Sequence, residues 1–143
     1  MVTWKTDVET AYIVLIVSDQ PDMAATWNTL FTQRNCIVLV ESDTSDALQS
    51  ARLIDPSLVV IDVQLPKDER AVLLRQLRAT CRGRILMLIA ANTVDEILEA
   101  NRSGADECLV KPVNPAVLIV KAMAWLGNGH RNDRRHSPIS VTL

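Results

Sequence analysis

Residues 58–66 have the sequence Leu58-Val59-Val60-Ile61-Asp62-Val63-Gln64-Leu65-Pro66. Four apolar residues followed by an acid, with a proline close behind, are typical of a buried strand that ends in a loop. An acid in that place presents its carboxylate at the carboxyl edge of the sheet, where open α/β sheets carry their functional groups. Two other apolar runs end in a polar residue in the same way, one at Asp19 and one at Lys111. If the three strands are parallel neighbours, Asp19, Asp62 and Lys111 converge on one site.

The whole chain alternates short apolar runs with longer amphipathic segments. The runs predict strands at about 12–18, 36–40, 57–62, 85–90 and 107–111. The amphipathic segments predict helices from Pro21 to about Arg34, from Thr44 or Ser45 to about Leu53, at about 67–80, from Thr93 to near Gly104, and from Asn114-Pro115 to about Leu126. Strict alternation implies a parallel sheet with helices on both faces. Because crossovers are right-handed, the predicted fold is a flavodoxin-like (βα)5 doubly wound sheet with strand order 2-1-3-4-5.

Local signals set several helix ends and core faces. Thr93-Val94-Asp95-Glu96 is a capping box, and Gly104 suits a left-handed carboxyl cap. Apolar residues at core spacing are expected to face the sheet. They include Trp27, Leu30 and Phe31 in the first helix and Val72, Leu73 and Leu77 in the third.

The composition limits the class of protein. A chain of 143 residues is one domain by size, and 48% apolar with 22% charged residues is an ordinary globular composition. The formal charge of −2 argues against a dedicated nucleic-acid binder. No apolar run approaches the roughly 20 residues of a membrane span, and the amino terminus lacks a signal-peptide layout. Cys36, Cys81 and Cys108 lack metal-ligand spacing, so we expect reduced thiols in a cytoplasmic protein.

Four motifs together resemble the receiver domain of bacterial two-component response regulators. They are Ser18-Asp19-Gln20-Pro21, Asp62-Val63-Gln64-Leu65-Pro66, Gly104-Ala105-Asp106-Glu107 and Lys111-Pro112. One motif alone would be weak, but four in this order, at strand ends and with family-like separations, are specific. The resemblance divides the chain into a lead-in (1–11), a receiver domain (12–126) and a linker or tail (127–143).

The resemblance implies that Asp62 accepts a phosphoryl group from a sensor histidine kinase or a small phosphodonor. It also implies a Mg²⁺ ion held by Asp19, Asp62 and the backbone carbonyl of Gln64, with Lys111 paired to the phosphoryl oxygens. Mg²⁺ prefers such oxygen ligands and keeps several waters. Each residue also has an ordinary interpretation. Asp19 would then cap the first helix, Asp62 would be a loop acid, and Lys111 a solvated strand end.

Several residues depart from the family pattern. Ser18 stands where the family has a second acid, which predicts weaker Mg²⁺ binding. Ile89 stands where the family usually has a Thr or Ser that contacts the phosphoryl group. If the alignment to the family is shifted by one residue, Ala90 stands there instead. Cys108 replaces the usual Tyr or Phe, and Arg70 replaces a common Gly. The site therefore keeps its phosphoacceptor and lysine while both usual switch residues are replaced.

The last predicted helix is apolar nearly all round, with Lys121 its only charge, so we expect it to be covered on more than one face. Winged-helix response regulators dimerise through the segments that correspond here to 93–104, 107–111 and 115–126. Glu107 and Lys121 match one of their cross-subunit ion pairs, and Ile97 and Val117 would replace another with an apolar contact. We hypothesise a homodimer that forms without phosphorylation. The alternative is that absent flanking sequence covers the helix.

Residues 127–143 are basic and polar, and their end alternates like the lead-in to a winged-helix domain. DNA contact is therefore expected only through an absent output domain that regulates transcription. The leading prediction is a phosphoacceptor in signalling, and the alternative is a phosphorylation-independent dimerisation or docking module. An aspartate-nucleophile phosphatase is disfavoured because Gln64 occupies the position of its second acid. We therefore do not expect an enzyme.

Overall fold

The computed structural model describes residues 11–90 and 93–127. In these residues five parallel strands form one sheet in the order β2-β1-β3-β4-β5, which confirms the predicted topology. The strands are β1 (Ile13–Ser18), β2 (Ile37–Glu41), β3 (Leu58–Asp62), β4 (Arg84–Ile89) and β5 (Glu107–Val110). The helices are α2 (Pro21–Thr32), α3 (Thr44–Ile54), α4 (Lys67–Thr80), α5 (Val94–Ser103) and α6 (Pro115–Gly127).

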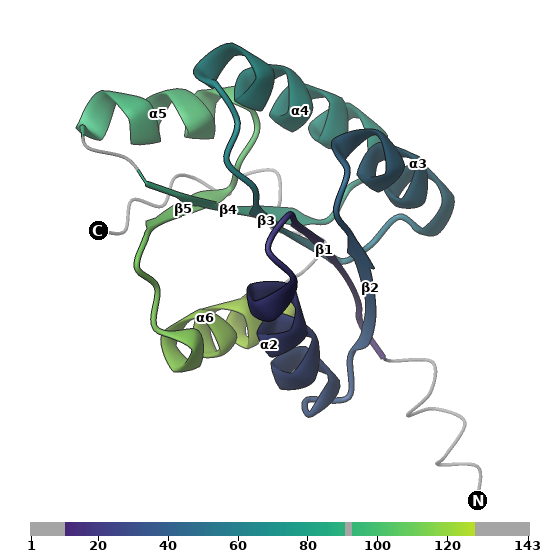
Figure 1. Cartoon of the computed structure of the whole chain (residues 1–143). Coiled ribbons are helices and arrows are strands. Elements are labelled where there is room, and N and C mark those ends of the chain that lie inside the picture. Colours follow the sequence, from purple (N-terminus) through teal and green to yellow (C-terminus); the bar gives the residue numbers. More distant parts are fainter. Residues whose placement is uncertain (1–10, 91–92, 128–143) are drawn as a thin grey trace, which may run out of the picture.

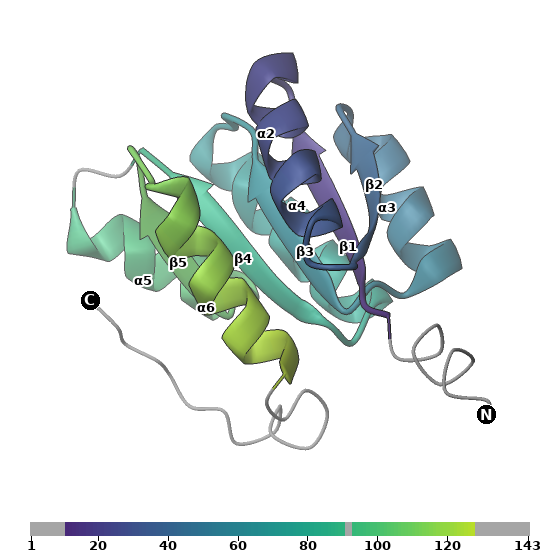
Figure 2. The same cartoon turned by 90° about the horizontal axis from the view of Figure 1, so that it is seen from below.

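The sheet separates two helical layers. Helices α3, α4 and α5 cover one face, and α2 and α6 cover the other (Figures 1 and 2). Each layer has its own hydrophobic core, one under α3–α5 and one under α2 and α6. The central strand β3 is buried along its whole length, as its unbroken apolar sequence predicts for a strand covered on both faces.

Most helix ends follow the predicted signals. The Thr93 side chain accepts a hydrogen bond from the Glu96 amide, as predicted. Gly104 is the carboxyl cap of α5, but its φ of 140° and ψ of −11° differ from the left-handed helical conformation that was expected. The predicted cap of α3 at Thr44 or Ser45 is wrong. Asp43 lies in extended backbone one residue earlier, and its carboxylate accepts from the Asp46 amide at 3.1 Å.

The predicted core face of α4 is also partly wrong. Val72 is 43% exposed, while Leu74 is fully buried beside Leu73 and Leu77. These three leucines are separated by one, three and four positions and form the stripe that faces the sheet, and Val72 lies at the edge of that stripe.

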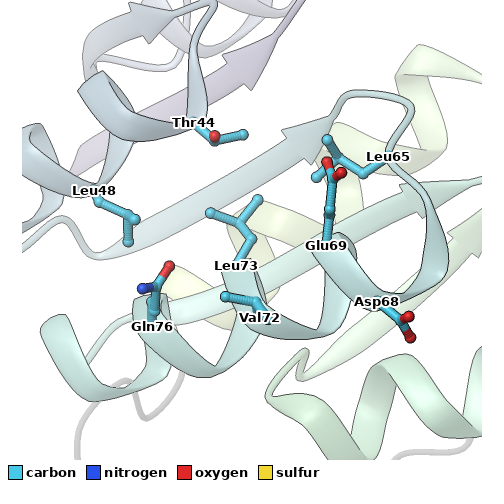
Figure 3. Close-up of a pocket in the computed structure, with 8 residues that line it drawn as sticks. All are labelled: Thr44, Leu48, Leu65, Asp68, Glu69, Val72, Leu73 and Gln76. Atoms are coloured by element: carbon cyan, nitrogen blue, oxygen red, sulfur yellow. The ribbon is translucent and has the colours of Figure 1, made fainter.

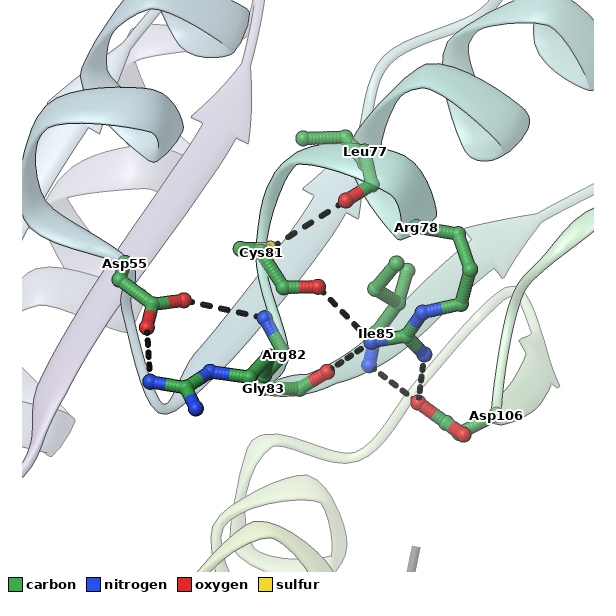
Figure 4. A network of polar contacts seen from close by, with 8 residues as sticks. All are labelled: Asp55, Leu77, Arg78, Cys81, Arg82, Gly83, Ile85 and Asp106. Carbon is green, nitrogen blue, oxygen red and sulfur yellow. Dashed lines mark hydrogen bonds and ion pairs between the residues drawn. The ribbon is translucent and has the colours of Figure 1, made fainter. Parts of the chain in front are cut away.

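The amino-terminal edge of the sheet is held by a polar network around Asp106 (Figure 4). Its Oδ2 accepts from the Ile85 amide at 2.7 Å and from Arg78 Nη1 at 3.0 Å. Arg78 Nη2 also donates to the carbonyl of Gly83. Asp106 thereby connects the start of β4 to α4, at the end of the sheet opposite Asp62.

Two segments predicted from the sequence fall outside the described residues, apart from one residue each. They are the lead-in (1–11) and the linker or tail (127–143). Within the described ranges, no helix has the length and apolar character needed to cross a membrane.

Candidate functional site

The carboxyl ends of β1 and β3 lie side by side, so their terminal residues meet at one edge. Ser18 and Asp62 are paired in register. On the other side of β3, the Lys111 amide donates to the Ile89 carbonyl at 2.9 Å, which holds the residue after β5 at the same edge. Because these strands are parallel, side chains separated by many residues in the sequence converge there.

Two side chains among the described residues make polar contacts with the Asp62 carboxylate. Lys111 Nζ lies 2.5 Å from Oδ1, and Trp27 Nε1 donates a hydrogen bond to Oδ2 at 3.3 Å. Asp62 is 1% exposed and Lys111 about one third exposed. The Lys111 contact is a close ion pair without hydrogen-bond geometry, so Oδ1 is a buried acceptor with no hydrogen-bond donor in the described residues. The lysine therefore offsets the buried negative charge of the carboxylate.

The other residues predicted for the site lie around this pair. Asp19 and Gln64 are exposed, one residue beyond β1 and two beyond β3. Ser18 is buried, and its hydroxyl is used locally, since Oγ accepts from the Gln20 amide at 3.2 Å and donates to the Gln20 carbonyl at 3.4 Å. Ser18 thus brings neither a charge nor a free hydroxyl to the site.

The residues present fit a hydrated Mg²⁺ ion. Asp62 Oδ1 is a buried oxygen without a hydrogen-bond donor, and the Asp19 carboxylate and Gln64 carbonyl are further oxygen donors beside the same edge. Mg²⁺ takes oxygen ligands and is commonly held by one or two carboxylates plus water. No group of three or more His, Cys, Asp or Glu side chains suited to a metal occurs in the described residues. The donor set therefore matches Mg²⁺ with several waters rather than a protein-enclosed metal.

The two replaced switch positions are apolar or neutral. Ile89 is buried in the core under α3–α5, and Cys108 packs against the same core. The Cys108 thiol donates weakly to Asn101 Oδ1 at 3.7 Å. Burial raises the pKa of Cys108 to about 11, so the thiol is neutral at pH 7. The charge of Arg70 lowers this pKa by a smaller amount, and the charge of Glu107 raises it. Neither side chain offers a charge or a hydroxyl toward Asp62.

The residues of the hypothesised dimer face have different surroundings in the chain itself. Lys121 Nζ lies 2.8 Å from Glu107 Oε2 of the same chain. Ile97 is half-buried against the core, whereas Val117 is 50% exposed. Glu107 and Lys121 therefore already satisfy one another within one subunit.

A separate groove lies between α3 and α4 (Figure 3). It has a volume of about 320 Å³ and is lined by Thr44, Leu48, Leu65, Asp68, Glu69, Val72, Leu73 and Gln76. Its charged lining residues are both acidic, so it does not suit a phosphoryl group. Asp62 and Lys111 are not among its lining residues.

Sequence reasoning missed one residue of the site, Trp27. It was predicted only as a core residue, and it is indeed 1% exposed in the core under α2 and α6. The available signal was chemical, because a buried indole N–H usually finds an acceptor. The sequence could not identify that acceptor as Asp62, which lies 35 residues away.

The described residues thus form a five-stranded parallel α/β sheet in which a buried acid is paired with a lysine at the carboxyl edge. The chain belongs to the response regulator receiver domain family, whose pattern matches residues 14–123.

Curated relatives and solved structures agree with this assignment. The DNA-binding response regulator MtrA of Mycolicibacterium smegmatis is 31% identical over 79% of this chain and 50% of its own length. The transcriptional regulatory protein AfsQ1 of Streptomyces coelicolor is 30% identical over 84% of this chain and 53% of its own. This chain thus spans about half the length of these relatives. A crystal structure of a two-component response regulator from Clostridium difficile has the same fold, with a TM-score of 0.75 at 20% identity over 82% of this chain and 97% of that one.

Proposed function

We propose that residues 12–126 form a receiver domain that accepts a phosphoryl group on Asp62 from a sensor histidine kinase or a small phosphodonor. The observation that carries the proposal is the contact of 2.5 Å between Lys111 Nζ and Oδ1 of the buried Asp62 carboxylate. A carboxylate is a competent nucleophile for forming an acyl phosphate. Residues 127–143 would then connect it to an output domain that controls transcription, as the names of the DNA-binding relatives suggest.

In the transfer, the only covalent contribution of the protein is the attacking oxygen of Asp62. One Asp62 oxygen attacks phosphorus, and the new O–P bond forms as the bond from phosphorus to the donor's nitrogen or oxygen breaks. The electron pair of the broken bond leaves with the donor. Lys111 places a positive charge next to the reacting carboxylate, where it would stabilise the phosphoryl oxygens. Mg²⁺ held by Asp19, Asp62 and the Gln64 carbonyl would supply further positive charge.

Intact-mass spectrometry tests the phosphoacceptor directly. The wild-type protein and Asp62→Asn are incubated with acetyl phosphate and Mg²⁺, and the adduct is checked for acid stability and base lability. We expect one phosphoryl group on the wild type and none on the variant. An unmodified wild type, or equal modification of both proteins, would contradict the proposal.

A second candidate function is dimerisation or docking that needs no phosphorylation. Exposed apolar side chains on α5, β5 and α6 favour it, together with the neutral Ser18, Ile89 and Cys108. These exposed side chains are Val94, Leu98, Val110, Val117 and Val120. Because Glu107 and Lys121 pair within the chain, such a dimer would rest on apolar contacts rather than on that ion pair.

Sedimentation of the unphosphorylated protein tests this candidate. We expect a dimer that Val120→Asp disrupts. Leu53→Asp is the matched control, since Leu53 is 78% exposed on α3, away from this face. A monomeric wild type at high concentration, or equal effects of the two substitutions, would refute this candidate and leave the phosphoacceptor proposal intact.

A further inference from the structure

Among the described residues, Trp27 is the one side chain of the α2–α6 layer that forms a hydrogen bond with Asp62, from Nε1 to Oδ2 at 3.3 Å. Both residues are 1% exposed, so water does not compete for this hydrogen bond. Hydrogen bonds to an ionised acceptor are roughly twice as strong as those between neutral groups. The indole therefore stabilises the charged, unmodified form of the Asp62 carboxylate.

The two carboxylate oxygens are held in different ways. Oδ2 receives the Trp27 hydrogen bond, whereas Oδ1 faces Lys111 and has no hydrogen-bond donor in the described residues. When either oxygen forms the O–P bond, the carboxylate becomes a neutral acyl group. Oδ2 then loses its share of the negative charge, and its hydrogen bond from Trp27 becomes weaker.

Resting on the phosphoacceptor function, we propose that Trp27 is a positioning residue that favours the unphosphorylated state and shortens the lifetime of the phosphoryl group. In dephosphorylation, water attacks phosphorus, the O–P bond breaks, and its electron pair returns to Asp62 as carboxylate charge. The indole N–H stabilises that returning charge. Losing the N–H thus lowers the dephosphorylation rate constant relative to the phosphorylation rate constant.

The test compares two matched substitutions of tryptophan. Trp27→Phe removes the N–H but keeps an aromatic ring in the core. Trp125→Phe makes the same chemical change on α6, where the ring lies 5.2 Å from Arg84 at the start of β4, the opposite end of the sheet. Phosphorylation by acetyl phosphate and subsequent decay are followed by intact-mass spectrometry, with circular dichroism to confirm folding.

We expect the ratio of the phosphorylation rate constant to the dephosphorylation rate constant to rise about tenfold in Trp27→Phe. This factor corresponds to the free-energy difference between a hydrogen bond to a charged acceptor and one to a neutral acceptor. Trp125→Phe should leave the ratio unchanged. A ratio in Trp27→Phe that is unchanged or lower, or that rises equally in both variants, would overturn the inference while the phosphoacceptor function stands. A wild type that takes no phosphoryl group would instead overturn the proposed function, and this inference with it.

A spectroscopic measurement on the wild-type fold covers the case in which Trp27→Phe does not fold. The sequence has three tryptophans, so ¹⁵N-tryptophan labelling gives at most three indole N–H signals, and Trp4→Phe and Trp125→Phe assign that of Trp27 by elimination. Beryllofluoride with Mg²⁺ is the probe, and Mg²⁺ alone is the control. We expect the Trp27 indole proton to move upfield when beryllofluoride occupies Asp62, because its hydrogen bond weakens. An unmoved or downfield signal would overturn the inference.

Discussion

Asp106→Ala should destabilise the domain by about 1–4 kcal/mol. The substitution removes the acceptor of the Ile85 amide, which lies on a fully buried residue, and leaves that N–H without a partner. An unsatisfied buried donor costs about 1–3 kcal/mol. The ion pair of Asp106 with Arg78 is partly exposed and adds about 0–1 kcal/mol. The sum is a large fraction of the roughly 5–15 kcal/mol by which domains are stable.

Urea unfolding followed by circular dichroism measures this loss, and a conservative variant separates its two parts. Asp106→Asn keeps an oxygen that can accept from the Ile85 amide but removes the charge, so we expect a loss of only about 1 kcal/mol. Glu99→Ala is the control for an exposed ion pair, since Glu99 Oε1 lies 3.4 Å from Nζ of the exposed Lys67. Equal losses for the Ala and Asn variants of Asp106, or an Asp106→Ala loss as small as that of Glu99→Ala, would refute the reasoning.

Three further predictions concern the fold around the site. Gly104→Ala should lower the free energy of unfolding by about 1–3 kcal/mol, as measured by urea unfolding, because φ is 140° and an added Cβ would lie 2.8 Å from the Leu74 carbonyl oxygen. An unchanged free energy of unfolding would show that alanine is not strained at this position. Lys121→Met should lower the free energy of unfolding by about 3 kcal/mol, because it leaves the buried Glu107 carboxylate unpaired. Adding Glu107→Gln should recover most of that loss. No recovery would show that the unpaired charge of Glu107 is not the cause. The third prediction is a pH dependence. Burial raises the pKa of Cys108 from 9.0 to about 11, so the folded state binds the thiol proton more tightly than the unfolded state does. The stability that this proton contributes is complete below pH 9 and is lost as the pH rises to 11. Cys108→Ala should therefore lose less stability than the wild type over that window, and equal slopes would exclude Cys108 as a source of the loss.

The strand order and most strand positions could be predicted because a strand that is buried on both faces has an unbroken run of apolar residues in the sequence. Every residue of β3 is buried, and each is apolar except Asp62 at the carboxyl end. The cap at Thr93 and the turn at Gly104 were predictable for a local reason, since each depends on backbone groups a few residues away. Asp43 was missed as the cap of α3 because it stands in a run of polar residues, 42–46, in which several side chains could accept the same amide.

The site was predictable only in part, because its contacts join distant segments. Parallel strands bring Asp62 and Lys111 to one edge, and that follows from topology alone. The Trp27 contact also depends on the rotation of α2 about its axis and on a side-chain rotamer, which a pattern of apolar residues does not determine. In the same way, Glu107 and Lys121 were assigned to a subunit interface because the sequence cannot show that they meet within one chain.

The two helical layers differ in how they can respond to a change at Asp62. Ile89 and Cys108 belong to the core under α3–α5 and lack the polar groups through which the family usually senses a phosphoryl group. Trp27 belongs to the other core, which also includes Leu118 and Ile119 of α6. If Asp62 accepts a phosphoryl group as proposed, the hydrogen bond that would change strength lies on the α2–α6 side of the sheet. The replacements at Ile89 and Cys108 lie in the other layer and leave the hydrogen bond between Trp27 and Asp62 intact. The exposed apolar residues Val117 and Val120 lie on α6, the helix that shares its core with Trp27.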